Sequence, residues 1–398
     1  MERKYFERAG WEFDWKKDSY AALTVIRLLD MKETKPEVWE RFQRLEDHNE
    51  SRREEEPELW EYHEKHIVSF ITEKLGLTEF SVDEVRGAVG KMFTNCGDLE
   101  LSAAHARGCG YYPTYANMNH NCRANTKTFK YASDQRLEVR AQEAIASGQE
   151  ISTQYVTSMK ATFARRPVLA AKWYFDCGCD RCLDPSELGS CLSGLQCTSP
   201  APSTSKMCGG CVLSLDPTSG EADWSCRCCG QIYPPEAVLE VISAVSADVE
   251  TARDSDKDSI HHFERILHEY STRLHPQHYI LVDVKLKLAQ ILGNYAPYQL
   301  STLSRPLKER KIQLCQEVLD VISIVDPGFT KQRGIMLSEL NKTKLALAKQ
   351  NLSVPENTNN PKFKKLFENA CREKQFLCMY LAHYQNMFHG GGDPKKSG

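Results

Sequence analysis

The sequence has no long apolar run and no excess of charge of one sign. Its 398 residues include 51 lysines and arginines against 54 aspartates and glutamates, a net charge of −3. Because no run of about 18 apolar residues occurs, we expect no membrane-spanning helix. The near-neutral balance gives no reason to expect direct nucleic-acid binding. The first twenty residues contain no apolar secretory core, so we expect a protein of the cytoplasm or nucleus.

Cysteine is absent from the first 95 residues and abundant further along the chain. Ten of the sixteen cysteines lie between Cys177 and Cys229. In a reducing compartment such clustering favours metal ligation by thiolates over disulfide formation. The scattered cysteines are expected to be free buried thiols; they are Cys96, Cys109, Cys315, Cys371 and Cys378.

Apolar residues recur at helical spacing near both ends of the chain, and shorter segments lie between them. Residues 1–95 are predicted to be helical, with one helix ending at Gly76, and the charged run Glu50 to Glu58 is interpreted as a solvated linker. The middle is predicted to be a small β-rich unit. Its expected strands are Asn125–Tyr131, Leu137–Arg140 and, after a turn at Gly148, Ile151–Val156.

After Pro234 and Pro235 the sequence is again helical, with Pro and Gly breaks between helices. Apolar stripes at 281–292, 314–322, 337–347 and 363–370 indicate antiparallel helix hairpins stacked as a solenoid of the tetratricopeptide (TPR-like) kind. We therefore predict an α+β fold: a β-rich core with cysteine modules, a helical segment before it and a helical solenoid after it.

Two cysteine patterns predict structural zinc. Cys177, Cys179 and Cys182 offer three ligands within six residues, and four-coordinate zinc needs one more from elsewhere. The second pattern consists of two Cys-x2-Cys knuckles that are separated by fourteen residues. Their predicted ligands are Cys208, Cys211, Cys226 and Cys229, with Cys197 and Cys228 as possible substitutes. No open coordination position is indicated, which favours a structural over a catalytic role.

Three motifs occur in a fixed order along the middle of the chain. The first is Asn119-His120-Asn121-Cys122, followed by Asn125; the second is Gly148-Gln-Glu-Ile-Ser-Thr-Gln-Tyr155; the third is Phe175-Asp-Cys-Gly-Cys-Asp-Arg-Cys182. This order resembles the second half of a SET domain, with its Asn-His-Ser-Cys-x-Pro-Asn turn, Gly-Glu-Glu-Ile-x-x-x-Tyr segment and post-SET cysteines. The helical flanks resemble the SET-and-MYND family, and its arthropod-type members in particular.

The resemblance implies a protein-lysine N-methyltransferase that uses S-adenosylmethionine. Asn119 and His120 would hold the cofactor, Phe175 would pack on its adenine, and Tyr155 would contact it at the methyl-transfer point as the catalytic residue. Cys122 would complete the zinc site of Cys177, Cys179 and Cys182. The partners implied are a protein substrate with a target lysine, histone or non-histone, and further proteins bound by the C-terminal helices. A role in transcriptional regulation would follow.

The sequence also departs from the family pattern. No glycine pair of the kind that opens a SET domain occurs near the start, and no cysteines for a MYND zinc module precede Cys96. Asn121, Ala124 and Gln149 replace the usual Ser, Pro and Glu, and Trp173 stands where many members place a tyrosine of the lysine channel. These departures leave open a second reading: a SET-like scaffold without catalysis, derived from a shortened isoform or gene model.

The resemblance divides the chain into five segments. These are a helical SET-insert region (1–95), the C-terminal half of the SET domain (96–160), a post-SET and second zinc module (161–232), a helical TPR-like domain (233–390) and a flexible tail (391–398).

Overall fold

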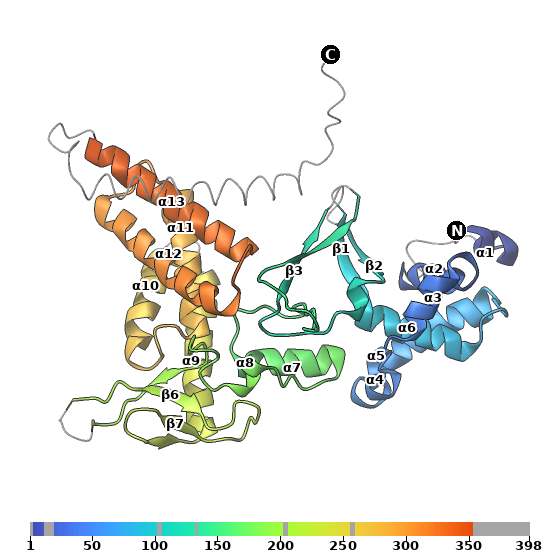
Figure 1. Ribbon diagram of the computed structural model, residues 1–398, viewed down its shortest axis with the longest axis horizontal. Helices are drawn as coiled ribbons and strands as arrows, with labels where there is room; N and C mark the ends of the chain where they lie inside the picture. Colours follow the sequence, from blue (N-terminus) through green and yellow to red (C-terminus); the bar gives the residue numbers. More distant parts are fainter. Residues whose placement is uncertain are drawn as a thin grey trace, which may run out of the picture. The chain divides into compact units, whose positions relative to one another are not determined.

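The computed structural model describes residues 3–11, 20–101, 106–131, 134–201, 206–254 and 259–352 (Figure 1). The chain forms two compact units. The first unit comprises Met1–Asn119, Thr128–Val139 and Leu169–Phe175, and the second comprises His120–Lys127, Arg140–Val168 and Asp176–Gly398. The five-segment division expected from the sequence remains a prediction.

The first unit is built mainly of helices around one apolar core. Its helical elements are α1 (Arg3–Ala9), α2 (Tyr20–Thr34), α3 (Pro36–Gln43), α4 (Asn49–Glu55), α5 (Pro57–His63), the π-helices η1 (Glu64–Val68) and η2 (Phe70–Lys74), α6 (Val82–Asn95) and the 3-10 turn η3 (Tyr115–Asn117). The strands β1 (Gly97–Leu101) and β2 (Ala106–Gly110) form an antiparallel pair after α6. Helix α6 begins with a capping box, in which Ser81 and Glu84 satisfy each other's backbone N–H groups.

The interpretation of the charged run Glu50 to Glu58 as a linker is wrong. This run lies in helices α4 and α5, and Arg52 within it is only 3% exposed. Its guanidinium donates to the Asp47 carbonyl (2.9 Å) and to the Thr94 hydroxyl (3.2 Å). These hydrogen bonds compensate the desolvation of the charge, so a segment that looks solvated in sequence is partly buried.

Two of the three strands predicted in the middle of the chain are confirmed. The strands β3 (Thr126–Lys130) and β4 (Leu137–Ala141) pair in a two-stranded sheet. The third, Ile151–Val156, is wrong, because only an isolated parallel bridge between Thr153 and His120 occurs there. The side chain of Asn125 takes the backbone groups of Glu150 and Ser152 that a ladder would use.

The second unit joins a small sheet to a bundle of helices. Its first helices are part of α7 (Thr162–Trp173) and α8 (Asp180–Leu183). An antiparallel sheet of order β5-β6-β7-β8 follows, made of β5 (Leu195–Gln196), β6 (Cys211–Ser214), β7 (Trp224–Cys226) and β8 (Ile232–Tyr233). The helices after it are α9 (Pro235–Asp254), α10 (Ser259–Glu269), the 3-10 turn η4 (Tyr270–Thr272), α11 (Tyr279–Asn294), α12 (Arg305–Val325) and α13 (Lys331–Leu352).

One continuous apolar core underlies both parts of the second unit. It runs from Leu192 and Trp224 in the cysteine-rich module to Leu288 on α11 and Val318 on α12. Helices α11, α12 and α13 lie side by side (Figure 1). The α+β class is therefore confirmed, with small antiparallel sheets, N-terminal helices and a C-terminal helical bundle.

Some expectations fall outside the described residues: the stripe at 363–370, the tail 391–398, and Cys371 and Cys378. Within the described ranges, no helix is both long enough and apolar enough to cross a membrane.

The buried imidazole of His63 makes the stability of the first unit depend on pH. His63 stacks on Phe93 with ring centroids 4.2 Å apart, and burial, helped by nearby Arg52, lowers its pKa from 6.5 to about 4. Below pH 6.5 the unfolded chain binds a proton that the folded chain excludes, so the free energy of unfolding should fall as pH drops toward about 4. In His63→Phe that slope should flatten, as measured by urea unfolding across this range.

The matched control is His66→Phe, a half-exposed histidine on the neighbouring π-helix, which should keep the wild-type slope. Identical slopes for wild type and His63→Phe would contradict the assignment.

Candidate functional site

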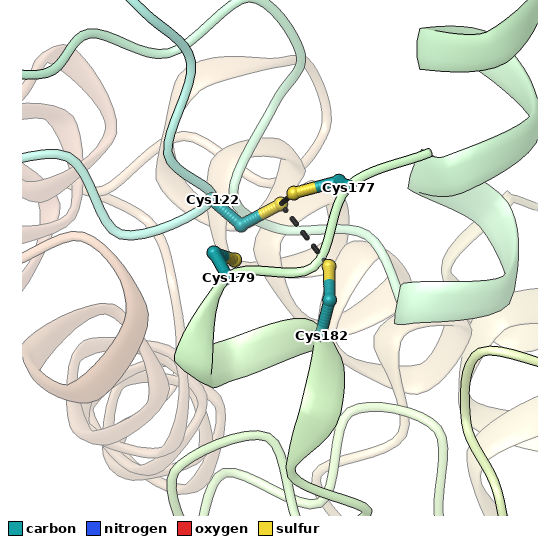
Figure 2. A group of neighbouring side chains, drawn as sticks. All are labelled: Cys122, Cys177, Cys179 and Cys182. Atoms are coloured by element: carbon teal, nitrogen blue, oxygen red, sulfur yellow. Dashed lines mark hydrogen bonds between the residues drawn. The ribbon is translucent and has the colours of Figure 1, made fainter. Parts of the chain in front are cut away.

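Four thiols from two distant parts of the second unit converge in one buried cluster (Figure 2). This first cysteine cluster consists of Cys122, Cys177, Cys179 and Cys182, whose sulfurs all lie within 4.8 Å of one another. The Sγ of Cys122 is 4.0 Å from that of Cys177 and 3.5 Å from that of Cys182. Tetrahedral zinc with bonds of about 2.3 Å places sulfurs roughly 3.8 Å apart, whereas a disulfide requires about 2.05 Å. The spacing fits zinc.

The local backbone presents three of these thiols from a single loop. Cys179 is the N-cap of the short helix α8, and its carbonyl accepts the N–H of Cys182 at 2.8 Å. This turn places Cys179 and Cys182 on the same side of the loop, as Figure 2 shows. Cys122 reaches the loop from a segment more than fifty residues earlier. A bound zinc would therefore hold two remote segments together.

Buried arginines surround the first cysteine cluster. Arg165 Nε donates to Cys122 Sγ (3.2 Å), and its NH2 group lies 3.6 Å from Cys182 Sγ. Both Arg165 and Arg181 pair with Glu187, at 2.7 and 2.9 Å, and all three side chains are fully buried. Because zinc with four thiolates carries net negative charge, cationic donors beside it stabilise the thiolate form.

Electrostatics keeps Arg165 charged in this environment. Burial alone would favour its neutral form, but Glu187 and the Cys122 sulfur together raise the pKa of Arg165 above its ordinary value. Arg181 has the opposite balance: burial, then repulsion from Arg165, lowers its pKa. The negative charge of Glu187 thus offsets the cost of burying two guanidinium groups in the same water-free region.

The Asn-His turn is docked onto the segment that carries Tyr155. His120 bridges to Thr153 in parallel fashion, and the Asn121 N–H donates to the Thr153 carbonyl at 2.9 Å. The Tyr155 N–H donates to His120 Nδ1 at 3.0 Å, and the two rings lie 5.3 Å apart. Burial lowers the pKa of His120 to about 4. The imidazole is therefore neutral near pH 7.

Asn125 ties the turn to this segment a second time. Its Nδ2 donates to the Glu150 carbonyl (2.8 Å), and its Oδ1 accepts the Ser152 N–H (2.9 Å). The Thr126 hydroxyl adds a bond to the Ser152 carbonyl at 2.6 Å. Because Asn125 is only 5% exposed, these bonds are shielded from water and fix the register of two segments that do not form a regular sheet.

The residues expected to hold the cofactor are divided between the two units. Asn119 and Phe175 belong to the first unit, and His120 and Tyr155 belong to the second. Neither unit by itself brings all four together.

The first unit fixes the position of Trp173. Its indole Nε1 donates to the Thr94 carbonyl at 3.1 Å. A tyrosine at this position could not make the same bond, because its ring carries no nitrogen. The next residue, Tyr174, has a positive φ of 55° and donates its hydroxyl to Glu56 at 2.7 Å.

A separate pocket of about 590 Å³ opens in the second unit. It is lined by Asn121, Arg123, Asn125 and Glu143 among others, and by none of the four expected cofactor residues. Arg123 and Glu143 form a bidentate pair along its wall, at 3.0 and 3.1 Å.

The second cysteine cluster differs from its predicted ligand set in one residue. Cys208, Cys226 and Cys229 come together as predicted, but the fourth thiol is Cys197 and not Cys211. Sulfur separations of 3.5 Å (Cys197 to Cys229) and 3.8 Å (Cys208 to Cys226) fit tetrahedral zinc.

Backbone pairing explains the exchange of Cys211 for Cys197. The Cys197 N–H donates to the Gly210 carbonyl and its carbonyl accepts the Gly209 N–H, which sets Cys197 against the first knuckle. A side chain at Gly210 would come within 2.8 Å of Cys226 Sγ, so the knuckle closes only around glycine. Cys211 begins strand β6, and Cys228 is exposed and belongs to neither cluster.

The Arg165 contacts predict a strong effect of removing its charge. In Arg165→Met, Glu187 loses one buried partner and the thiolates lose a donor, so the free energy of unfolding should fall by about 3–5 kcal/mol. Zinc should also pass faster to a chromogenic chelator. Both are measurable on the purified full chain by urea unfolding and stopped-flow absorbance.

Arg253→Met is the control, because Arg253 pairs with Asp283 at the surface and its loss should change the unfolding free energy by no more than about 0.5 kcal/mol. Wild-type stability and wild-type zinc release in Arg165→Met would contradict the role given to this arginine.

Comparison with known proteins identifies the domain that contains the turn. The SET domain family model matches residues 22–156, a stretch that includes the Asn-His turn and Tyr155. The SET domain-containing protein SmydA-8 of Drosophila melanogaster, isoform B, is 27% identical over 182 residues, which are 44% of this chain and 38% of that protein.

Two further relatives are methyltransferases by name. The histone-lysine N-methyltransferase Smyd1 of Mus musculus is 29% identical over 118 residues, covering 26% of this chain and 24% of that protein. The N-lysine methyltransferase SMYD2-B of Xenopus laevis is 27% identical over 146 residues, covering 31% and 33%. In each case the match spans less than half of the relative's length. The chain is a SET-domain protein related to the SET-and-MYND family.

Proposed function

We propose that this chain is an S-adenosylmethionine-dependent protein-lysine N-methyltransferase of the SET-and-MYND type. One observation carries the proposal: the Asn-His turn is docked onto the Tyr155 segment, through the His120–Thr153 bridge and the Tyr155 N–H bond to His120. This pairing lies inside the stretch that matches the SET domain model.

The proposed roles follow the chemistry of the residues. Asn119 and His120 would hold the polar groups of the cofactor, and Phe175 would stack on its adenine. The cofactor supplies a methyl group activated on a sulfonium sulfur. Tyr155 would offer its oxygen and ring face to the cationic centre and align the lysine nitrogen with the methyl carbon.

The reaction asks little acid–base work of the protein. A lysine nitrogen attacks the methyl carbon only as the neutral amine, so a dry channel that lowers the lysine pKa favours reaction. The nitrogen–carbon bond forms as the carbon–sulfur bond breaks, its electron pair stays on sulfur, and the proton of the new ammonium returns to solvent. Alignment is the main contribution of the site, which suits a turn fixed by Asn125 and by the first cysteine cluster.

The substrate proposed is a histone or non-histone protein with an accessible lysine, because relatives that match the domain carry histone-lysine and lysine methyltransferase names. The C-terminal helices would bind further protein partners, and the setting would be the nucleus, the cytoplasm or both.

One observation favours a second function, that of a SET-like scaffold without catalysis. Trp173 stands where the resemblance expects a tyrosine hydroxyl, and its indole is committed to the Thr94 carbonyl. A bulky ring without a hydroxyl would narrow a lysine channel and could not orient the amine.

Calorimetric titration of the zinc-loaded full chain with S-adenosylmethionine separates these functions when combined with a methyl-transfer assay on histones and a lysine-peptide array. We expect binding and transfer. Tyr155→Phe should bind cofactor about as tightly as wild type but transfer methyl roughly 100-fold more slowly, because the reacting atoms are less well aligned.

Tyr295→Phe, an exposed tyrosine in the second unit, is the control and should match wild type in both assays. Absence of binding at about 1 mM cofactor would reject the enzyme. Binding without transfer to any lysine would support the scaffold.

A further inference from the structure

A third group of metal-type side chains lies in the second unit, apart from the two four-cysteine clusters. It consists of Cys191, Cys211 and His275, whose ligand atoms all lie within 4.8 Å of one another. All three residues are half-buried. They come from three separate segments: the turn after α8, the first residue of β6, and the loop before α11. Chance proximity along one loop therefore does not account for the group.

The backbone of a single glycine holds two of these residues. The Gly194 N–H donates to the Cys191 carbonyl at 2.9 Å, and the Gly194 carbonyl accepts the His275 N–H at 3.0 Å. A Cβ atom at this position would lie 3.0 Å from Cys211 Sγ and 3.2 Å from the His275 Cβ. All three residues thus pack around a position that has little room for a side chain.

Strand β5 fixes the same arrangement from the other side. Its two residues, Leu195 and Gln196, follow Gly194 directly; Gln196 is in register with Cys211, and Leu195 bridges to Leu274. Cys211 and the residue before His275 are therefore both paired with one two-residue strand. The three side chains are brought together by main-chain pairing, so the group is already arranged before any ligand binds.

This arrangement explains why Cys211 lies outside the second cysteine cluster. In an isolated knuckle, Cys208 and Cys211 would face one metal, yet Cys197 takes the fourth place in the second cysteine cluster. Cys211 is thereby released to meet Cys191 and His275. The two four-cysteine clusters leave out Cys191 and Cys211, and both of these thiols lie beside the imidazole of His275.

Two thiolates and one imidazole are ligands that zinc prefers, and zinc is commonly four-coordinate in proteins. Since the three side chains are half-buried, water can reach the fourth position. His275 Nδ1 accepts the N–H of Gln277 at 3.2 Å. Metal ligation would replace this long hydrogen bond, because Nδ1 either binds the metal itself or carries the proton when Nε2 binds.

We propose that Cys191, Cys211 and His275 bind a third zinc ion, with water as the fourth ligand. This ion joins the loop before α11 to the cysteine-rich sheet, and so ties the start of the helical bundle to the zinc module. The site is independent of methyl transfer, because none of its residues belongs to the Asn-His turn or the first cysteine cluster.

Elemental analysis of the purified, zinc-equilibrated full chain tests the stoichiometry. We expect three zinc ions per chain in wild type and two in Cys191→Ser and in His275→Gln. Cys191→His keeps a metal ligand and should return to three. Cys228→Ser is the matched control, an exposed cysteine of the same module outside every cluster, and should also hold three.

Differential alkylation followed by peptide mass spectrometry assigns the site residue by residue and does not depend on the folding of a variant. In zinc-loaded wild type, Cys191 and Cys211 should react far more slowly than Cys228, and a chelator should remove that protection. Two zinc ions in wild type, with Cys191 and Cys211 as reactive as Cys228, would overturn the proposal. A disulfide between Cys191 and Cys211 in protein purified with zinc would overturn it as well.

Discussion

The convergence of Cys122 on the loop of Cys177, Cys179 and Cys182 is the contact on which the rest of the site depends. Neither segment forms a regular sheet, and their few backbone bonds could not by themselves hold an Asn-His turn against a remote loop. Four sulfur ligands on one ion would supply that constraint, and Arg165 would offset the negative charge that they create. The turn can then present His120 to the Tyr155 segment with a fixed register.

The same solution recurs in the cysteine-rich module, where a four-stranded sheet of very short strands lies beside two cysteine groups. Strands of two to four residues pair too few backbone groups to be stable alone. The core shared with the helices compensates for their shortness, and metal bound by the cysteines would add to it. Buried positive charges are also compensated: Arg52, Arg165 and Arg181 are all buried, and each donates to carbonyl, hydroxyl, carboxylate or sulfur acceptors.

The sequence predicts those features that depend on local spacing. Helix stripes and the Cys-x-Cys-x2-Cys motif are read within a few residues, and the structure agrees with both. Features set by distant partners were missed. Spacing alone assigns Cys211 to the second cysteine cluster, but strand pairing, which knuckle spacing does not encode, places it beside Cys191 and His275. The sequence does not indicate that Arg52 is buried, because its acceptor Thr94 lies far along the chain. Apolar periodicity predicts a strand at Ile151–Val156, because it takes no account of the hydrogen bonds that the Asn125 side chain makes there.

We infer that zinc at the first cysteine cluster holds the Asn-His turn in place. Hydrogen exchange with mass spectrometry, before and after chelation of the full chain, tests it most directly. We expect the amides of Asn121, Asn125 and Ser152 to lose protection when zinc is removed, while those of α6 in the first unit keep theirs. Unchanged protection at the turn in zinc-free protein would contradict it.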